Sequence, residues 1–328
     1  MRTLLAIFDG LPFTSNGLIR RLLHLAAVVI AVSVLTFVLV DLLPGDAAFE
    51  VAGQNASLDE VAAIREELGL NRNILVRYGA WLADAAAGDL GRSFHTREPV
   101  WDAIVSRLPV TLELLVLSQV LALALAVPVG IFCAYRAESR MDRFLNSVAF
   151  ATVSVPVFIM ALLLIYMFSL RLRWLPATGY LPLPLGIWAN LRTMVMPAAS
   201  IALVEWVALM RVLRSDLIAT LQEDFILMAR AKGLPAVHIL LRHALRPSMF
   251  TLITILGLHI GHLIGGAVIV EWIFALPGMG RLLVTAIFGR DAVTVQGCIL
   301  FVTVGYVMIN FCVDLLYAVL DPRIRAKI

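Results

Sequence analysis

The 328-residue chain is poor in charged residues, since Asp, Glu, Lys and Arg together make up only 15% of it. Soluble domains carry about 25% charged and about 45–50% apolar residues. Here 61% of the residues are hydrophobic and the mean hydropathy is +0.93. A soluble fold would have to expose much of that apolar surface. The composition therefore excludes the soluble class and predicts an integral membrane protein.

Cysteine is also scarce, with three residues in the chain. Cys133, Cys298 and Cys312 all lie in apolar runs and show no C-x-x-C spacing. This pattern excludes a disulfide framework and a zinc site, and it favours buried structural thiols. The first apolar run, Leu4–Phe8, is too short for a cleavable signal peptide. We expect the segment 1–21 to be a cytoplasmic lead-in to the first membrane span.

The sequence lacks the motifs of several enzyme classes. Its two lysines, Lys232 and Lys327, are followed by Gly233 and Ile328, whereas a phosphate-binding loop needs G-x4-G-K-[ST]. The chain also has no H-E-x-x-H and no G-x-S-x-G sequence, which excludes the corresponding metalloprotease and hydrolase sites. We therefore expect no catalytic residue, no metal and no cofactor on this chain. A partner or an ion gradient must supply any energy.

Long apolar runs dominate what is present. A helix needs about 20 mostly apolar residues to cross about 30 Å of hydrocarbon, and continuous runs of this length favour helices over a barrel. The expected fold is therefore all-α with six transmembrane helices. They cover Leu22–Leu43, Leu114–Tyr135, Ser147–Leu170, Met194–Met210, Met249–Val270 and Val295–Leu320.

Charge sets the expected orientation of these spans. With the N-terminus inside, both lysines and the larger share of the arginines lie in the inside segments. Those segments are net positive, while the outside segments are slightly net negative. Because basic residues favour the cytoplasmic side, we expect both termini to be cytoplasmic. The net charge of +3 is therefore explained by the basic inside segments and does not indicate a nucleic-acid-binding surface. We expect no nucleic-acid partner.

The two main outside segments are expected to be structured. In the first, 44–110, Ser57 and Glu60 form a capping-box pattern before a helical apolar run, which predicts a small extracytoplasmic helical lid. The last outside loop is too apolar for a solvated loop and contains Pro277, Gly278 and Gly280. We expect non-helical backbone there that dips toward the membrane against protein or a water-filled cavity, as a gate would.

The loop 211–247 between spans four and five is basic and helix-prone. Apolar residues recur at helical spacing through Leu213, Leu217 and Leu221. Gly233 should end that helix, and Pro235 suits the start of a second helix, Ala236–Leu245, which Pro247 should terminate. A basic surface that only satisfies topology or touches anionic lipid is the simpler interpretation. A helix–turn–helix with a Gly-Leu-Pro corner instead indicates a lever that another protein contacts.

Motifs along the chain resemble one known family. ARAKGL at Ala229–Leu234 and HALR at His243–Arg246 resemble the cytoplasmic signature of ABC importer permeases, in particular the dipeptide/oligopeptide/nickel branch. Further matching segments run along nearly the whole chain: Leu18–Leu23, Pro44–Asp46, Glu66–Leu70, Gly88–Gly91, Pro176–Tyr180, Glu271–Arg281, Arg290–Asp291, Gln296–Gly297 and Asp321–Arg325. The wider importer signature is met only in part. Leu227 stands in the place of its glutamate, and Pro247 comes one position late.

The resemblance implies a type I importer transmembrane fold in a prokaryotic inner membrane, N-in and C-in. It implies one half of a translocation pathway for peptides or a related small solute, completed by a second homologous permease. Two ATP-binding cassette subunits, which hold ATP and Mg, and an extracytoplasmic solute-binding protein would be further partners, besides membrane lipid. By the same resemblance the ATPase-coupling residues are Ala229, Arg230, Ala231, Lys232, Gly233, Leu234, His243 and Arg246.

Polar residues within the spans suggest an alternative. A carboxylate at mid-bilayer costs about 2.5–3.5 kcal/mol on insertion scales and often marks a pathway or proton relay. Glu205 lies near mid-span, and His259 and His262 share one helix face. These three residues, with Pro277, Gly278 and Gly280, are the candidate path and gate. They could also serve an ion-coupled secondary transporter, or the histidines could bind a metal or only pack helices.

The expected organisation follows from these assignments. The segments are the lead-in 1–21, the first transmembrane helix 22–43, the extracytoplasmic lid 44–110, the permease core 111–320 with the coupling loop 211–247, and the cytoplasmic tail 321–328.

Overall fold

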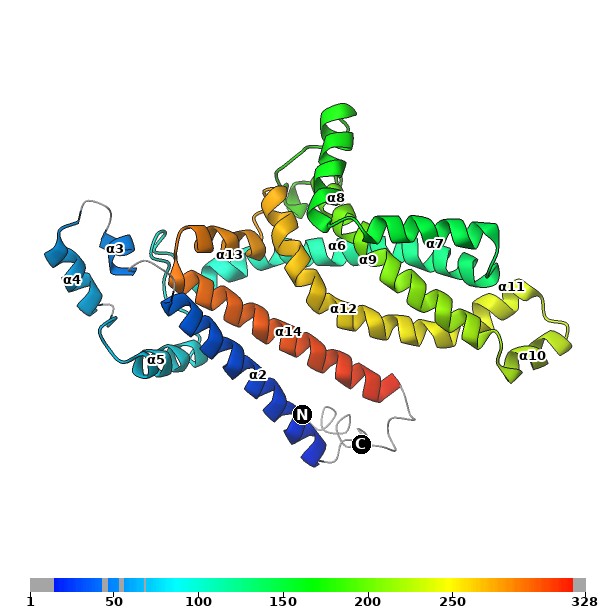
Figure 1. Cartoon of the computed structure of the whole chain (residues 1–328), viewed down its shortest axis with the longest axis horizontal. Coiled ribbons are helices and arrows are strands. Elements are labelled where there is room, and N and C mark those ends of the chain that lie inside the picture. The colour runs from blue at the N-terminus through cyan, green and yellow to red at the C-terminus, as the bar shows by residue number, and fades with distance from the viewer. Residues whose placement is uncertain (1–14, 43–46, 53–55, 68, 321–328) are drawn as a thin grey trace. The chain divides into compact units, whose positions relative to one another are not determined.

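The computed structural model describes residues 15–42, 47–52, 56–67 and 69–320. Most of the expected lead-in, the Pro44–Asp46 motif and the 321–328 tail lie outside these ranges. The chain forms two compact units, Met1–Pro109 with Gly278–Ile328, and Val110–Pro277. Over the described ranges the secondary structure is helical apart from one isolated bridge between Arg92 and Pro99 (Figure 1).

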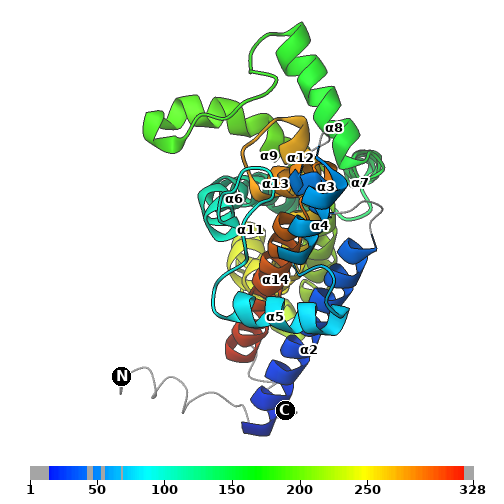
Figure 2. The same cartoon turned by 90° about the vertical axis from the view of Figure 1, so that its left-hand side faces the viewer.

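The first unit contains a pair of long apolar helices, α2 (Ser15–Asp41) and α14 (Ala292–Leu320), which lie side by side (Figures 1 and 2). Four shorter helices belong to the same unit. They are α3 (Ala47–Ala52), α4 (Leu58–Glu67), α5 (Ile74–Ala86) and α13 (Met279–Phe288). Helix α6 (Val100–Tyr135) begins in this unit and continues into the second.

The predicted capping box is present at the start of α4. The Ser57 amide donates to Glu60 Oε2 over 2.8 Å, and the Glu60 amide donates to Ser57 Oγ over 3.3 Å. These bonds at Ser57 hold the pKa of the Glu60 carboxyl below its usual range. Helix α5 is attached to α2 by aromatic contacts of Phe37 with Tyr78 and Trp81. The segment 44–110 is therefore largely helical in its described residues, as the apolar spacing predicted.

The second unit is built on α9 (Ile187–Thr220), which packs against α6 and against further helices of the unit. These are α7 (Arg140–Val153), α8 (Val157–Leu164) and α12 (Leu245–Ile273). The remaining elements are a π-helical segment η1 (Ile165–Arg171), a 3₁₀ turn η2 (Leu183–Leu185), α10 (Asp224–Ala231), α11 (Ala236–His238) and a second π-helical segment η3 (Ile239–Ala244).

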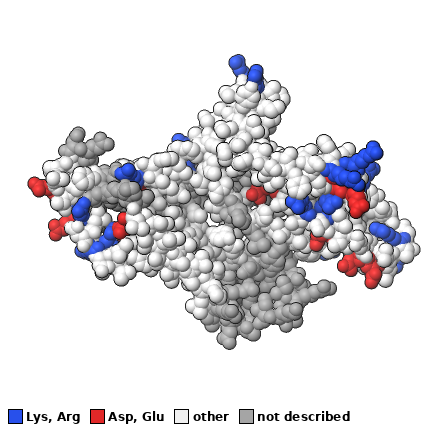
Figure 3. Space-filling model, viewed as in Figure 1, with Lys and Arg blue, Asp and Glu red and all other residues white. Residues whose placement is uncertain are grey.

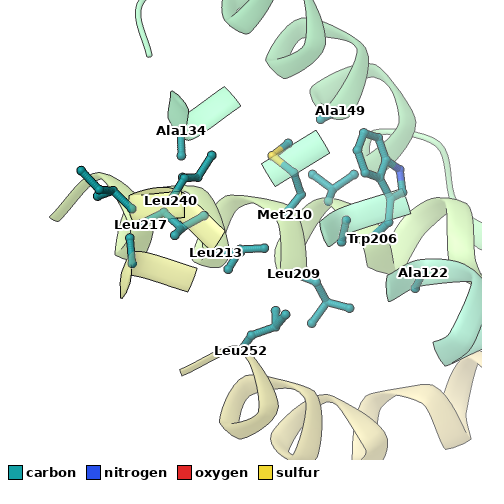
Figure 4. Packing of buried hydrophobic residues seen from close by; sticks show 14 of the residues in the cluster. Ala122, Ala134, Ala149, Trp206, Leu209, Met210, Leu213, Leu217, Leu240 and Leu252 are labelled. Carbon is teal, nitrogen blue, oxygen red and sulfur yellow. The ribbon is translucent and has the colours of Figure 1, made fainter. Parts of the chain in front are cut away.

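Buried side chains from several elements form the main core of this unit. Leu209, Met210 and Leu213 of α9 are fully buried. In Figure 4 they lie among Ala134 of α6 and Leu240 of η3, with Leu252 of α12 on the other side. The core thus connects α9 to both the membrane helices and the loop that follows α9. Van der Waals packing of these side chains holds the elements together, because lipid supplies no hydrophobic driving force between membrane helices.

Within the described ranges, five helices are long and apolar enough to cross a membrane, and a sixth span results if one bent pair counts as a single crossing. This agrees with the six expected spans, but the third is not one straight helix. Helices α7 and α8 meet at a bend of 98°. Pro156 disfavours helical backbone at the residue before it, and Pro156 itself is extended, with ψ 145. The prediction of a continuous helix over 147–170 was therefore wrong.

Two other expected boundaries differ from the structure. Pro247 does not end a helix, because α12 begins at Leu245 and continues to Ile273. A proline near a helix start loses no essential donor, and the wider π-helical turn η3 precedes it. The loop expected to be non-helical around Pro277–Gly280 is only a short turn. Helix α13 begins at Met279, so Gly280 lies within it.

Candidate functional site

The segment from α10 to Arg246, here called the 224–246 element, contains the predicted corner. The Gly233 amide donates to Arg230 O over 2.9 Å, and the Leu234 amide donates to Ala229 O over 3.3 Å. Gly233 has φ +74, in the left-handed region that glycine adopts without a Cβ penalty. Pro235 follows in extended backbone and precedes α11. Gly233 follows the end of α10 by two residues, as the predicted stop requires, but the expected continuous helix from Leu213 is wrong, because the chain turns between Thr220 and Asp224 and α10 is a separate helix.

One face of the 224–246 element is anchored in the core of the second unit. Ile226 of α10 and Ile239, Leu240 and Ala244 of η3 are buried in the same cluster as Leu217 of α9. Figure 4 shows Leu240 beside Leu217. A displacement of this element would therefore be transmitted to α9 through close-packed side chains, which resist compression.

The opposite face of the element is apolar and basic. Large hydrophobic side chains on it are 46–62% exposed, namely Phe225, Leu227, Met228, Val237 and Leu241. Of the predicted coupling residues, Arg230, Ala231, Lys232, Gly233 and Arg246 are exposed, and Leu234 and His243 are partly buried. Ala229 is 7% exposed and faces the core. Exposed apolar patches of this kind mark interaction sites.

Glu205 and His259 meet between α9 and α12. The His259 imidazole donates from Nδ1 to Glu205 Oε2 over 2.9 Å, and the side chains are 27% and 19% exposed. Both residues lie near the middle of their helices. The structure therefore unites two of the residues singled out from the sequence. The side chain of His262 lies outside the described part.

The predicted gate residues fall at a turn in the chain. Pro277 is exposed at the end of the second unit, while Gly278 and Gly280 are buried in the first. Before Pro277, the Leu276 amide donates to Glu271 O over 2.9 Å. Ala275 has φ +55, so a non-glycine residue occupies the left-handed cap that ends α12.

A polar network that the sequence did not reveal lies in the second unit near this turn. Tyr180 donates to Glu113 Oε2 over 2.7 Å, and Thr111 donates to the fully buried Glu271 over 2.7 Å. Burial and the adjacent Glu113 raise the pKa of Tyr180 to about 12, so the phenol stays protonated and donating at neutral pH. The Gly179 amide also donates to Phe274 O over 3.0 Å.

The motifs at 176–180 and 271–281 contained the signal for this network, because both were singled out as segments. Their pairing was not visible, since Tyr180 and Glu113 are separated by 67 residues. Among the described residues no three His, Cys, Asp or Glu side chains are close enough to hold a metal ion. The described residues thus show a two-faced element anchored in the core, a hydrogen-bonded Glu205–His259 pair between α9 and α12, and a hydrogen-bonded turn before Pro277.

Residues 126–326 match the family described as binding-protein-dependent transport system inner membrane component, and residues 15–115 match the N-terminal region of the same kind of component. A protein of Brucella abortus (strain 2308), named as a peptide transport system permease, is 42% identical over 94% of this chain and 98% of its own. The chain belongs to this family of importer permeases.

Other relatives support the same membership. The glutathione transport system permease protein GsiC of Escherichia coli (strain K12) is 36% identical over 95% of this chain and 99% of its own. A protein of Sinorhizobium fredii, named as a peptide ABC transporter permease, is 36% identical over 94% and 98%.

The chain is therefore a non-catalytic, multi-pass transmembrane subunit of an ABC importer, whose ATP hydrolysis takes place on separate subunits. This confirms the family resemblance found in the sequence motifs. The comparisons do not support the alternative of an ion-coupled secondary transporter.

Proposed function

We propose that this permease forms one half of a translocation path for peptides or a closely related small solute, such as glutathione. The relatives are named as peptide and glutathione permeases, which supports this solute class. A second homologous permease would complete the path, and two ATP-binding cassette subunits would hold ATP and Mg. A solute-binding protein on the extracytoplasmic side would deliver the solute.

The proposed orientation places both termini and the loop 211–247 in the cytoplasm. The bias of lysine and arginine toward these segments supports it. The 224–246 element would then lie where ATPase subunits can reach it. In this orientation the lid formed by the segment 44–110 is extracytoplasmic.

The observation that best supports the coupling role is that the 224–246 element has two different faces. Its inner face is packed on Leu213 and Leu217 of α9, and its outer face exposes apolar residues beside Arg230 and Lys232. An ATPase subunit would bury the outer face. Movement imposed there would pass through the core to α9, and ATP binding would thus alternate access to the path.

The path itself would run beside Glu205 and His259, with His262 on the same helix. Ionisable residues at mid-membrane usually face a bundle interior or a water-filled cavity and mark substrate pathways. The partial exposure of both side chains supports this placement. The turn at Pro277–Gly280 would form part of the outer gate.

Substitutions at Gly233 test the coupling role. A Cβ at this position meets no atom within 4 Å, so the constraint is the positive φ alone. Gly233→Val should strain the corner, because β-branched residues rarely adopt this conformation. Gly233→Asn should be tolerated, since asparagine often does. We expect Gly233→Val to lower ATP-dependent uptake about tenfold or more and to weaken ATPase association.

Uptake into right-side-out vesicles loaded with ATP and co-purification of the ATPase would be measured for both variants at matched expression. Gly233→Asn serves as the control for adding a side chain of similar size. Wild-type uptake with full ATPase association in Gly233→Val would refute the coupling role. Uptake that persists without ATP and stops on loss of the proton gradient would refute the importer mechanism as a whole.

A further inference from the structure

A groove of about 550 Å³ lies between α7 and α9 in the second unit. Its wall combines apolar and polar side chains from both helices. They are Asn146 and Phe150 of α7 with Ala208, Arg211, Val212, Arg214 and Ser215 of α9. None of these residues is among the eight predicted ATPase-coupling residues or the path and gate residues, although residues 211–215 lie at the start of the loop 211–247.

The groove carries one uncompensated positive charge. Arg214 pairs with the carboxylate of Asp142 over 2.7 Å. In the part of the chain that the structure describes, Arg211 makes no such ion pair. Its guanidinium Cζ instead lies 4.9 Å from the centre of the Phe150 ring. Arg211 is exposed and remains available to an anion.

The surroundings of the groove add to this charge. Arg136, Arg140 and Arg143 are all exposed at the α6–α7 turn and the start of α7, where Glu138 is the exposed acidic residue. Figure 3 shows basic side chains gathered over that end of the unit. Asp216 on α9 is partly buried, and Asp142 is neutralised by Arg214. The local field therefore favours an anion.

The same groove borders on an apolar surface. Phe150 is 52% exposed, and Val148 and Val153 on α7 are 38% and 44% exposed. Arg211 directly follows the apolar stretch 194–210 of α9, so it lies where a span leaves the hydrocarbon. A basic side chain next to exposed apolar side chains can bind both the headgroup and the acyl chain of an anionic phospholipid, whereas a free phosphate needs no apolar wall.

We propose that the α7–α9 groove binds the headgroup of an anionic phospholipid. The phosphate would accept hydrogen bonds from the Arg211 guanidinium and the Ser215 hydroxyl, and an acyl chain would lie along the exposed Phe150 side of α7. The cytoplasmic leaflet supplies this lipid under the proposed orientation. Binding itself does not depend on that orientation or on the solute.

Lipid binding by the full-length permease, purified with the ABC subunits that accompany it, tests the proposal. Phosphatidylglycerol would be titrated into delipidated protein, and bound lipid would be counted by native mass spectrometry alongside the thermal unfolding midpoint. Phosphatidylcholine is the neutral control, and glycerol 3-phosphate is the free-headgroup control. We expect selective retention of phosphatidylglycerol and no binding of glycerol 3-phosphate at the same concentrations.

Three variants locate the site. Arg211→Gln should weaken phosphatidylglycerol binding about fivefold, since one basic side chain contributes about that factor at an anionic surface. Arg211→Lys should retain most of the binding. Arg143→Gln removes the same charge from an exposed position that does not line the groove, and it should change the affinity less than Arg211→Gln.

Ala208→Phe fills the groove without changing its charge and gives a second test if Arg211→Gln fails to fold. It should also abolish selective binding. Unchanged phosphatidylglycerol affinity in Ala208→Phe, or equal binding of glycerol 3-phosphate, would overturn the proposal. Efficient cross-linking of Ser215→Cys to the second permease would overturn it too, because a protein would then cover the groove. None of these readouts uses transport, so their failure is distinct from failure of the proposed function.

Discussion

Arg214 of α9 donates two hydrogen bonds to the carboxylate of Asp142 at the start of α7. Nε lies 2.9 Å from Oδ1, and Nη2 lies 2.7 Å from Oδ2. The Asp142 carboxylate also accepts the Glu138 amide over 2.9 Å and the Asn146 amide group over 2.8 Å. This arrangement fixes the turn after α6 to the helix that leads into the 224–246 element.

We expect Asp142→Asn to destabilise the protein by about 2 kcal/mol. Asp142 is 2% exposed, and loss of its charge leaves Arg214 without its counter-ion. The 25% exposure of Arg214 lets water compensate in part, which keeps the effect below that of a fully buried pair. Thermal unfolding in detergent would measure it. Asp216→Asn is the control, because Asp216 lies on α9 near Arg214 and outside any ion pair of the described residues. Equal midpoints for the two variants would contradict the prediction.

A close approach in the first unit gives the second prediction. A Cβ added to Gly297 of α14 would lie 2.6 Å from Val100 Cγ1 and 3.5 Å from Leu90 Cβ. We expect Gly297→Ala to lower stability by about 1–3 kcal/mol, because extra atoms in a packed contact force the neighbours apart. The thermal unfolding midpoint would again be measured.

A rescue and a control make this prediction specific to the contact. Val100→Ala removes the nearest methyl group, so Gly297→Ala should cost less in the Val100→Ala background than alone. Gly305→Ala lies on the same helix with nothing within 4 Å of the added Cβ, and it should be neutral or stabilising. If Gly297→Ala behaves like Gly305→Ala, the close packing is not present.

Features that depend on neighbouring residues were predictable from the sequence. The long apolar runs gave the spans, because hydrocarbon requires them whatever the tertiary contacts. The Ser57–Glu60 capping box and the left-handed Gly233 likewise depend on backbone geometry within a few residues. The bend at Pro156 also had a local signal, since a proline stands in the middle of the third apolar run.

Features that join distant segments were not predictable from one sequence. The Asp142–Arg214 pair spans 72 residues, and the Thr111–Glu271 bond spans 160. Hydropathy and periodicity identify which face of a helix is apolar, but they do not identify its partner. Pro247 shows a further limit, because a proline signals both a helix end and a tolerated first-turn residue.

The Glu205–His259 pair gives the last prediction and separates a path role from a packing role. Glu205→Gln keeps an oxygen acceptor for His259 Nδ1 but removes the negative charge, whereas Glu205→Leu removes both. Because a side-chain hydrogen bond contributes about 0.5–1.5 kcal/mol to stability, we expect Glu205→Leu to lower the unfolding midpoint and Glu205→Gln to leave it nearly unchanged. If the pair faces the path, Glu205→Gln should still alter solute preference. Competition uptake with dipeptides that carry a positive, neutral or negative side chain would measure this preference. We expect the preference for the positively charged dipeptide to fall about threefold to tenfold, because that is the contribution of a single charge-assisted contact. An unchanged preference order in Glu205→Gln, with a lowered midpoint in Glu205→Leu, would assign the pair to helix packing alone.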